Sequence, residues 1–172
     1  MSIQKLQDQL GEFAKDIKLN LSSVLKAEAD LTQTQVAGVA LASAFATKNV
    51  TVIADLQAEF INVANENITN AAKGAATLMA MNNVYYRATH LMSDHEYQQM
   101  PAKLRMNFMM NPGVDNKDFE MYSLAVSAIN GCGMCIDSHA NKLSKDGVSK
   151  QAIQHILRIA AVVNAAAQAI CI

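Results

Sequence analysis

The sequence predicts a single all-α domain, and three observations indicate it. Apolar residues make up 51% of the 172-residue chain and recur at helical spacing along most of it. No segment shows sustained alternation of apolar and polar residues, which is the pattern of a half-buried strand. With only 7 glycines and 2 prolines, the chain has few of the turn residues that a fold of many strands requires.

The N-terminal half begins with an apolar stripe and a capping signal. Five apolar residues separated by 3, 4, 3 and 4 positions predict an amphipathic helix: Ile3, Leu6, Leu10, Phe13 and Ile17. Thr32 with Gln35 forms a candidate capping box ahead of the alanine-rich run from residue 36 to residue 46. Further helices are expected over residues 51–65 and 69–86.

In the C-terminal half, turn residues separate three more expected helices. Asn111-Pro112-Gly113 marks a loop, because proline followed by glycine favours a turn. Asn130-Gly131 and Asp146-Gly147 mark two further breaks. The helices expected between these breaks cover residues 116–129, 132–143 and 149–170, and residues 93–113 are expected to be irregular.

A short internal repeat predicts two related halves within the single domain of residues 1–172. Leu41-Ala42-Ser43-Ala44 resembles Ala125-Val126-Ser127-Ala128 at an offset of 84 residues. At this offset the partners of Cys132, Cys135 and His139 are Lys48, Thr51 and Asp55, respectively. We therefore expect a degenerate N-terminal half, about residues 1–92, and a C-terminal half that carries the chemistry, about residues 111–172.

The overall charge and hydropathy argue against two classes of partner. A net charge of -1 with no basic stripe argues against nucleic-acid binding, which needs a concentrated positive surface. The most apolar stretch, residues 156–170, is interrupted by Arg158, Asn164 and Gln168, so a buried helix is favoured over a membrane span. Three cysteines and an N-terminus without an apolar signal region favour the cytoplasm.

The motif that indicates chemistry is Cys132-Gly133-Met134-Cys135, followed by His139. Because a helical residue advances about 100°, these two cysteines and the histidine would share a helical sector of roughly 60°. The thiolate is the reactive form of cysteine, and a helix N-terminus or a nearby imidazolium lowers the pKa of a thiol. The motif therefore predicts thiol–disulfide redox chemistry.

Two other interpretations of the cysteines stay open. A structural zinc site usually takes four thiolate or imidazole ligands, whereas the local motif offers three. In the second interpretation, the cysteines are incidental residues of the core, since buried cysteine often serves there as a small apolar residue. Cys171, next to the C-terminus, is expected to be a thiol without a redox role.

A carboxylate and several methionines lie near the motif in sequence. Glu120 interrupts an otherwise apolar run one helix upstream, and its side chain points either to solvent or towards the thiols. The spacing leaves both directions open, because the break at residues 130–131 makes the angle between the two helices unknown. The methionines, among them Met79, Met106 and Met109, are interpreted as core filler.

Several of these segments resemble the alkyl hydroperoxidase D (AhpD) family, within the carboxymuconolactone decarboxylase-like superfamily. The resemblance is strongest over residues 111–143, which contain Asn111-Pro112-Gly113, Phe119-Glu120 and the run from Ser127 through Cys132, Cys135 and His139. It extends to Asn82-Asn83-Val84-Tyr85-Tyr86-Arg87 and to His90-Leu91.

The resemblance implies an AhpD-like helical fold of two related halves and a homo-oligomer, expected to be a trimer. It implies a CxxC disulfide reductase that regenerates a peroxiredoxin partner and has peroxidase activity of its own. Dihydrolipoamide or a lipoylated protein would supply the reducing equivalents. By the same resemblance, Cys135 is the attacking thiol and Cys132 its resolving partner, and Glu120 and His139 relay protons.

One position departs from the family pattern. Mycobacterial-type members carry a histidine between the two cysteines, where this chain has Met134. The departure removes one proton carrier and leaves both cysteines in place. Two alternative functions remain, a stand-alone peroxidase for organic hydroperoxides and a non-catalytic redox sensor or zinc-stabilised protein.

Overall fold

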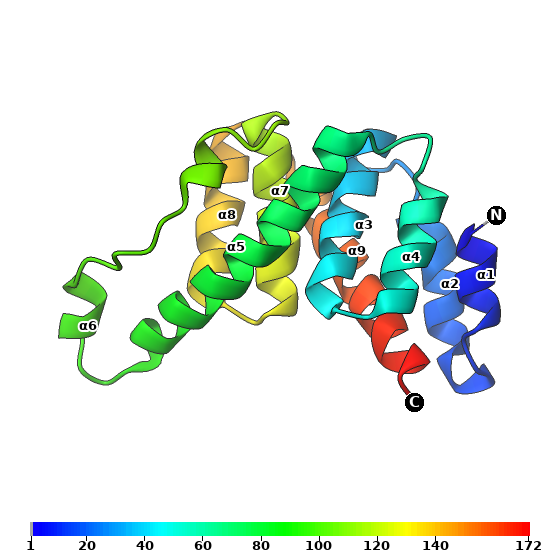
Figure 1. Cartoon of the computed structure of the whole chain (residues 1–172), viewed down its shortest axis with the longest axis horizontal. Coiled ribbons are helices and arrows are strands. Elements are labelled where there is room, and N and C mark those ends of the chain that lie inside the picture. Colours follow the sequence, from blue (N-terminus) through cyan, green and yellow to red (C-terminus); the bar gives the residue numbers. More distant parts are fainter. Residues whose placement is uncertain (1) are drawn as a thin grey trace.

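The computed structural model describes residues 2–172 and confirms the all-α prediction. This part of the chain forms nine α-helices and two 3-10 helices, and it contains no β-strand (Figure 1). The α-helices are α1 (Ser2–Asp8), α2 (Lys15–Val24), α3 (Gln33–Thr47), α4 (Val50–Glu59), α5 (Glu66–Leu91), α6 (Glu96–Gln99), α7 (Asn116–Ile129), α8 (Gly133–Lys145) and α9 (Lys150–Ile170). The 3-10 helices are η1 (Glu12–Ala14) and η2 (Asn107–Met110).

The capping signals explain several helix boundaries. The predicted capping box forms at the start of α3, where the Thr32 hydroxyl accepts the Gln35 N–H and the Gln35 side chain accepts the Thr32 N–H. The Asn65 side chain accepts the Ile68 N–H, so α5 begins earlier than the predicted residue 69. The adjacent expected helix over residues 51–65 ends correspondingly earlier, at Glu59.

The prediction of one continuous helix over residues 3–17 is wrong. The chain breaks after α1, and Gly11 adopts an extended conformation ahead of η1. Leu6 and Leu10 are buried as the stripe predicts, but Phe13 lies beyond the break and is 69% exposed. The helical spacing of apolar residues thus continues in the sequence across a break in the helix itself.

The centre of the core is α3, which packs against α5, α7 and α9. All residues from 36 to 44 are buried, as expected of a helix that is apolar on every face. Gly38 allows the ring of Tyr122 on α7 to approach the α3 backbone, where any Cβ atom would overlap the ring. Small residues on α3 thus let the central helices come close together.

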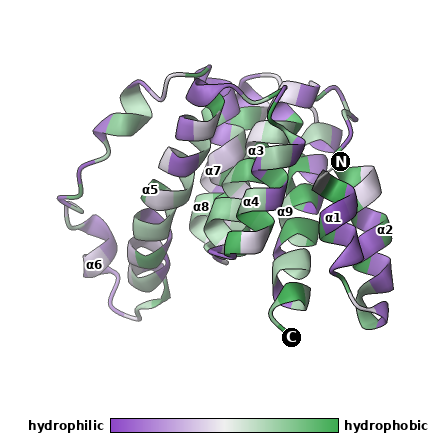
Figure 2. Ribbon diagram, turned by 45° about the vertical axis from the view of Figure 1, so that its right-hand side comes forward, coloured by the Kyte–Doolittle hydropathy of each residue, from purple (hydrophilic) through white to green (hydrophobic). Residues whose placement is uncertain are grey.

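The last long helix, α9, is long and apolar enough by composition to cross a membrane. In this fold it packs against α2, α3 and α7, and it buries a face that includes Ile156, Ile159 and Val163. Figure 2 shows α9 as mostly hydrophobic, in contrast to the mostly hydrophilic α6. The packing is that of a core helix.

The order of helices repeats along the chain. The helices α3, α4 and α5 begin at Gln33, Val50 and Glu66, which is 83, 83 and 84 residues before α7, α8 and α9 begin. Gly38 and Tyr122, which contact each other, are themselves separated by the 84-residue offset. The division into two related halves stays a prediction, and these offsets are consistent with it.

The segment between α5 and α7 extends away from the helical body (Figure 1). Within the region expected to be irregular, residues 93–113, it contains the short helices α6 and η2. The Phe108 ring packs on Gly74 of α5 and lies 6.0 Å, centroid to centroid, from the ring of Phe119 on α7. These contacts return the chain to the body just before α7.

Candidate redox site

The two cysteines lie at the start of α8. After α7 ends, Gly131 adopts a left-handed conformation with φ of +68°, which glycine reaches without steric cost. Cys132 follows as the N-cap residue, and its Sγ accepts the N–H of Cys135 at 3.4 Å. The sharp turn therefore places both sulfur atoms at the N-terminal end of the helix, where the positive end of the helix dipole lies.

Cys132 and Cys135 form a disulfide, with Cα atoms 5.3 Å apart. This separation lies inside the range that disulfides adopt. Cys132 is in an extended conformation at the N-cap, and Cys135 lies in the first turn of the helix. Cys132 is fully buried, and Cys135 is 7% exposed. The second cysteine is therefore the more accessible of the two.

Glu120 points inward and contacts His139. Its Oε2 lies 2.7 Å from Nδ1 of His139, and the two side chains are 19% and 10% exposed, respectively. Glu120 belongs to α7 and His139 to α8, so this contact joins the helices on either side of the Gly131 turn. Of the two directions that the sequence leaves open for Glu120, the structure has the inward one.

Cys135 and His139 open on the same cavity of about 290 Å³. They lie four residues apart on α8 and therefore on one face of the helix. Cys132 is not among the residues that line the cavity. A molecule that enters this space meets the Cys135 sulfur and the imidazole together.

Methionines form much of the cavity wall. Met79 is buried on α5, and its Sδ lies 3.3 Å from Nε2 of His139. Met106, Met109 and Met134 line the same space. The interpretation of Met79, Met106 and Met109 as mere core filler therefore misses their position beside the thiol. Flexible thioether side chains adapt to ligands of different shape, and this wall is suited to an apolar chain.

A buried amide network, which the sequence alone did not reveal, holds the cysteine turn against α5. Asn83 on α5 donates to the Ser127 hydroxyl at 3.0 Å and accepts from the Asn130 side chain at 2.9 Å. Arg87 donates to the carbonyl oxygen of Asn130. The Cys132 N–H donates to the Ser127 carbonyl oxygen at 3.2 Å. These bonds fix the residues on both sides of Gly131.

Three similar proteins carry the name alkyl hydroperoxide reductase AhpD. One from Coxiella burnetii (strain RSA 493 / Nine Mile phase I) is 55% identical over 168 residues, which cover 96% of this chain and 95% of that protein. One from Rhodopseudomonas palustris (strain BisA53) is 52% identical over 170 residues, which cover 99% of this chain and 93% of that protein. One from Brucella canis (strain ATCC 23365 / NCTC 10854 / RM-666) is 49% identical over 170 residues, which cover 99% of this chain and 97% of that protein.

This chain belongs to the AhpD family. Residues 95–170 also match the Carboxymuconolactone decarboxylase family. This range contains Glu120, Cys132, Cys135 and His139, all of which the structure gathers at the start of α8 or beside it. The AhpD-family resemblance that the sequence motifs indicate is thus confirmed, and it extends over nearly the full length of the chain.

Proposed function

We propose that this AhpD-family protein is a CxxC thiol–disulfide reductase with alkyl hydroperoxide reductase activity. The observation that carries the proposal is the placement of the Cys132–Cys135 disulfide at the start of α8. There Cys135 shares a cavity with His139, and Oε2 of Glu120 is within hydrogen-bond distance of Nδ1 of the imidazole. The names of the similar proteins support the same class of activity.

The proposed reaction begins with both cysteines reduced. The Cys135 thiolate attacks one sulfur of an oxidised partner, forms a mixed disulfide and releases the partner's other sulfur as a thiolate. The Cys132 thiolate then attacks the Cys135 sulfur, which forms the Cys132–Cys135 disulfide and releases the partner as a dithiol. Two electrons and two protons pass to the partner in total, and the partner's disulfide bond is replaced by the one within this chain.

The Glu120–His139 pair is suited to move the protons. When Glu120 is ionised, its Oε2 accepts the hydrogen on Nδ1 of His139, which assigns the lone pair of the neutral ring to Nε2. Because His139 lines the cavity with Cys135, its ring is placed to take up the proton that the thiol loses. The positive end of the α8 dipole stabilises the thiolate that remains.

The proposal also covers the redox partners of the protein, its assembly and its location in the cell. The oxidised partner would be a peroxiredoxin, and a dihydrolipoamide group on a lipoylated protein would return the Cys132–Cys135 disulfide to the dithiol. The cavity of about 290 Å³, with its thioether wall, is compatible with an apolar reductant arm that reaches Cys135. We further propose a cytoplasmic homo-oligomer, with three copies as the AhpD resemblance implies.

The same cavity favours a second candidate function, direct reduction of an organic hydroperoxide. The Cys135 thiolate would attack the terminal peroxide oxygen, giving an alcohol and a sulfenic acid on Cys135. Cys132 would then displace water from the sulfenic acid and close the disulfide. An apolar wall beside the accessible thiol suits the alkyl part of such a substrate.

Differential alkylation with intact-mass readout, across a dihydrolipoamide/lipoamide series, tests the proposal. We expect two thiols to switch together between the alkylated and disulfide forms, while Cys171 stays alkylated throughout. In a reduction assay with an oxidised peroxiredoxin, Cys135→Ser is expected to abolish turnover and Cys132→Ser to trap a mixed disulfide. Cys171→Ser serves as the matched control and is expected to turn over at the wild-type rate.

The outcomes separate the candidate functions. Hydroperoxide consumption with dihydrolipoamide alone, in the absence of any partner protein, would favour the direct peroxidase. If Cys132 and Cys135 stay alkylated in every dihydrolipoamide/lipoamide mixture, both redox proposals are wrong. Stoichiometric zinc with protected thiols and no two-hydrogen mass change would instead support the zinc-stabilised alternative.

A further inference from the structure

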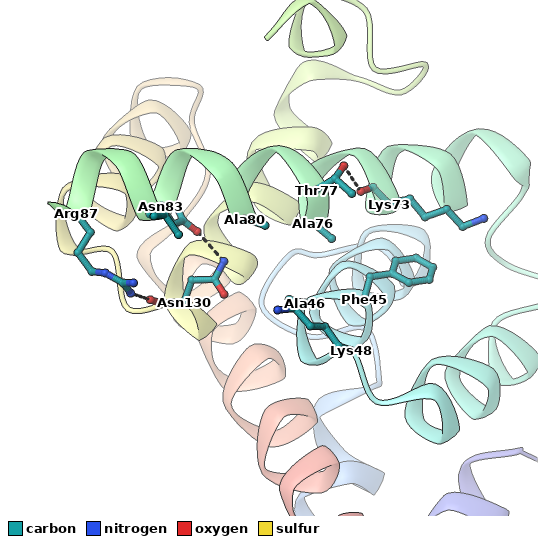
Figure 3. Close-up of a pocket in the computed structure, with 11 residues that line it drawn as sticks. Phe45, Ala46, Lys48, Lys73, Ala76, Thr77, Ala80, Asn83, Arg87 and Asn130 are labelled. Carbon is teal, nitrogen blue, oxygen red and sulfur yellow. Dashed lines mark hydrogen bonds between the residues drawn. The ribbon is translucent and has the colours of Figure 1, made fainter. Parts of the chain in front are cut away.

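Sulfur atoms are concentrated in the redox cavity. Four of the chain's ten methionines line it together with Cys135, namely Met79, Met106, Met109 and Met134. A second cavity of about 520 Å³, between α3 and α5, has a different chemistry (Figure 3). Lysine, arginine, alanine and asparagine line much of that cavity, and among the described residues no methionine, cysteine or histidine lines it. The redox cavity is therefore the place to look for a ligand that binds sulfur.

The imidazole of His139 offers a nitrogen donor in the same cavity. Ionised Glu120 accepts the hydrogen on Nδ1, so the neutral ring carries its lone pair on Nε2. Met79 Sδ lies 3.3 Å from Nε2, and a thioether has lone pairs but no hydrogen to donate. Two electron-pair donors therefore face each other at short range. A proton on Nε2, or a cation that both atoms coordinate, makes this contact favourable.

The spacing of these two donors suits one shared metal ion. A metal about 2.0 Å from an imidazole nitrogen and about 2.3 Å from a sulfur holds them about 3.3 Å apart when the angle at the metal is about 100°. The separation of Met79 Sδ and His139 Nε2 is 3.3 Å. Cys135 lies one turn before His139 on α8 and lines the same cavity. Once reduced, it supplies a thiolate as the third donor.

Glu120 supports this arrangement from behind the imidazole. A metal-bound histidine almost always donates its other ring N–H to a carboxylate, a carbonyl or water, which fixes the orientation of the ring. Oε2 of Glu120, 2.7 Å from Nδ1 of His139, is in this position. Met79 is buried on α5, so its thioether is confined as well. The nitrogen and sulfur donors are thus held in place before any metal arrives.

The kind of donor selects the metal. Thiolate and thioether sulfur are soft ligands that favour Cu(I), whereas Mg²⁺ and Ca²⁺ prefer oxygen. A structural zinc site usually takes four ligands from cysteine, histidine and carboxylate side chains. Within residues 2–172 no group of three such side chains is placed to hold a metal ion. The cavity becomes a metal site only through its thioethers, and this points to Cu(I).

We propose that the reduced protein binds one Cu(I) ion in the redox cavity, through Cys135 Sγ, His139 Nε2 and Met79 Sδ. The bond to copper replaces the hydrogen of the Cys135 thiol, which leaves as a proton, and no electron is transferred. In the disulfide form Cys135 Sγ is bonded to Cys132, so the thiolate ligand is absent. The proposal goes beyond the reductase function, since it requires a reduced Cys135 but no turnover.

Competition with the Cu(I) chelator bathocuproine disulfonate, without oxygen, tests the proposal. The absorbance of the chelator complex measures the copper that the protein does not hold. All proteins carry Cys171→Ser, which removes the exposed third thiol. We expect the reduced protein to hold one Cu(I) per chain against the chelator and the disulfide form to hold none.

Two methionine variants make the test specific to the cavity. Met79→Leu keeps the buried volume and removes a ligand, so it is expected to weaken Cu(I) binding by at least about tenfold, the usual minimum for losing even an outer partner of a metal site. Met121→Leu changes an equally buried methionine on α7 that does not line the cavity. This control is expected to keep the affinity of its parent.

The competing explanation is a Cu(I) ion held by the two cysteines alone. Cys132 does not line the cavity, and serine also caps a helix, so we expect Cys132→Ser to keep its affinity for Cu(I). A site made of two thiolates would lose its second ligand in this variant. X-ray absorption at the copper edge is expected to show both sulfur and nitrogen neighbours, with one sulfur fewer in Met79→Leu.

Four results would each overturn the proposal. These are a reduced protein that holds no copper, Met79→Leu with the affinity of its parent, loss of binding in Cys132→Ser, and a copper ion with sulfur neighbours alone. Because the readouts are copper affinity and copper coordination, they stay informative even if the protein fails to reduce a partner disulfide.

Discussion

Oε2 of Glu120 lies 2.7 Å from Nδ1 of His139 and connects α7 to α8 beside the redox pair. The two residues are 19 positions apart in the sequence, and the Gly131 turn brings them together. The opposite ring nitrogen of His139 contacts Met79 at 3.3 Å. Both nitrogens of the imidazole therefore have a fixed neighbour, and the ring is held in one orientation at the wall of the cavity.

Replacing Glu120 by glutamine tests this pair. The amide oxygen still accepts the Nδ1–H of His139 but carries no charge, so it stabilises the protonated ring less. If the ring takes up the Cys135 proton, Glu120→Gln slows disulfide exchange by about 10²-fold, the lower end of the usual effect of general acid–base catalysis. The measurement is the rate of partner-disulfide reduction in single turnover.

A matched control for this variant is Glu66→Gln, an exposed position in the first turn of α5, which is expected to leave the rate unchanged. Wild-type turnover by Glu120→Gln would show that the carboxylate takes no part in the proton transfer.

The Gly131 turn gives a prediction about stability. Gly131→Ala keeps the chain length but places a Cβ at φ of +68°, which costs about 1–2 kcal/mol in the left-handed region. We expect its free energy of unfolding in urea to fall by about that amount. Gly133→Ala is the matched control, because a Cβ there meets nothing within 4 Å and the backbone is helical.

Gly133→Ala is expected to leave the free energy of unfolding unchanged or to raise it by about 0.5 kcal/mol, since alanine favours a helix. Equal destabilisation by both changes would contradict the strain assigned to Gly131. Measuring both variants with the disulfide intact and reduced separates backbone strain from the effect of the cross-link.

The parts of the fold that the sequence predicted depend on local signals. Residues 116–129 form α7 with the predicted bounds, because Asp115 caps the first turn and Asn130-Gly131 ends the helix. The capping box of Thr32 and Gln35 is likewise contained within four residues. The redox motif itself was visible for the same reason, since Cys132 and Cys135 are three positions apart.

What the sequence left open depends on how helices pack. The contact of His139 with Met79 joins residues 60 positions apart, and no local pattern specifies which face of α5 meets α8. The direction of Glu120 was ambiguous because it depends on the angle at Gly131. At Phe13 the helical spacing gave a wrong result, since spacing continues across the break at Gly11 while the buried face does not.

A hydroxyl in the core gives the next prediction. The Tyr122 side chain is fully buried against α3, and its Oη has no hydrogen-bond partner within residues 2–172. Burial also raises the pKa of Tyr122 above its ordinary value, so the hydroxyl stays protonated. Tyr122→Phe removes the unpaired group and retains the ring.

We expect Tyr122→Phe to raise the free energy of unfolding by about 1 kcal/mol, because a buried polar group without a partner is costly. Tyr97→Phe, at an exposed position of α6, is the control and is expected to leave the free energy of unfolding unchanged. A loss of stability on Tyr122→Phe in urea unfolding would reveal that the hydroxyl does gain a partner in the folded protein.

The last prediction concerns the pH dependence of stability and rests on Asp118. Burial raises the pKa of the Asp118 carboxyl; the hydrogen bond from Gln35 lowers it, while nearby Asp115 raises it and Lys117 lowers it. A carboxyl whose pKa is higher in the folded state binds its proton more tightly there than in the unfolded chain. Its ionisation therefore reduces stability as the pH rises from its unfolded to its folded pKa.

Asp118→Asn removes this ionisation and keeps an oxygen that can accept from the Gln35 side chain. We expect the variant to gain stability relative to wild type as the pH rises from about 3 towards neutral, and the difference to become constant once Asp118 is ionised in both states. Urea midpoints across this range measure the difference. The control Asn20→Ser, on α2, introduces no titrating group and should follow the wild-type profile with pH. A gain that shrinks as the pH rises would mean that the folded protein favours ionised Asp118, and that the Gln35 hydrogen bond outweighs the cost of burial.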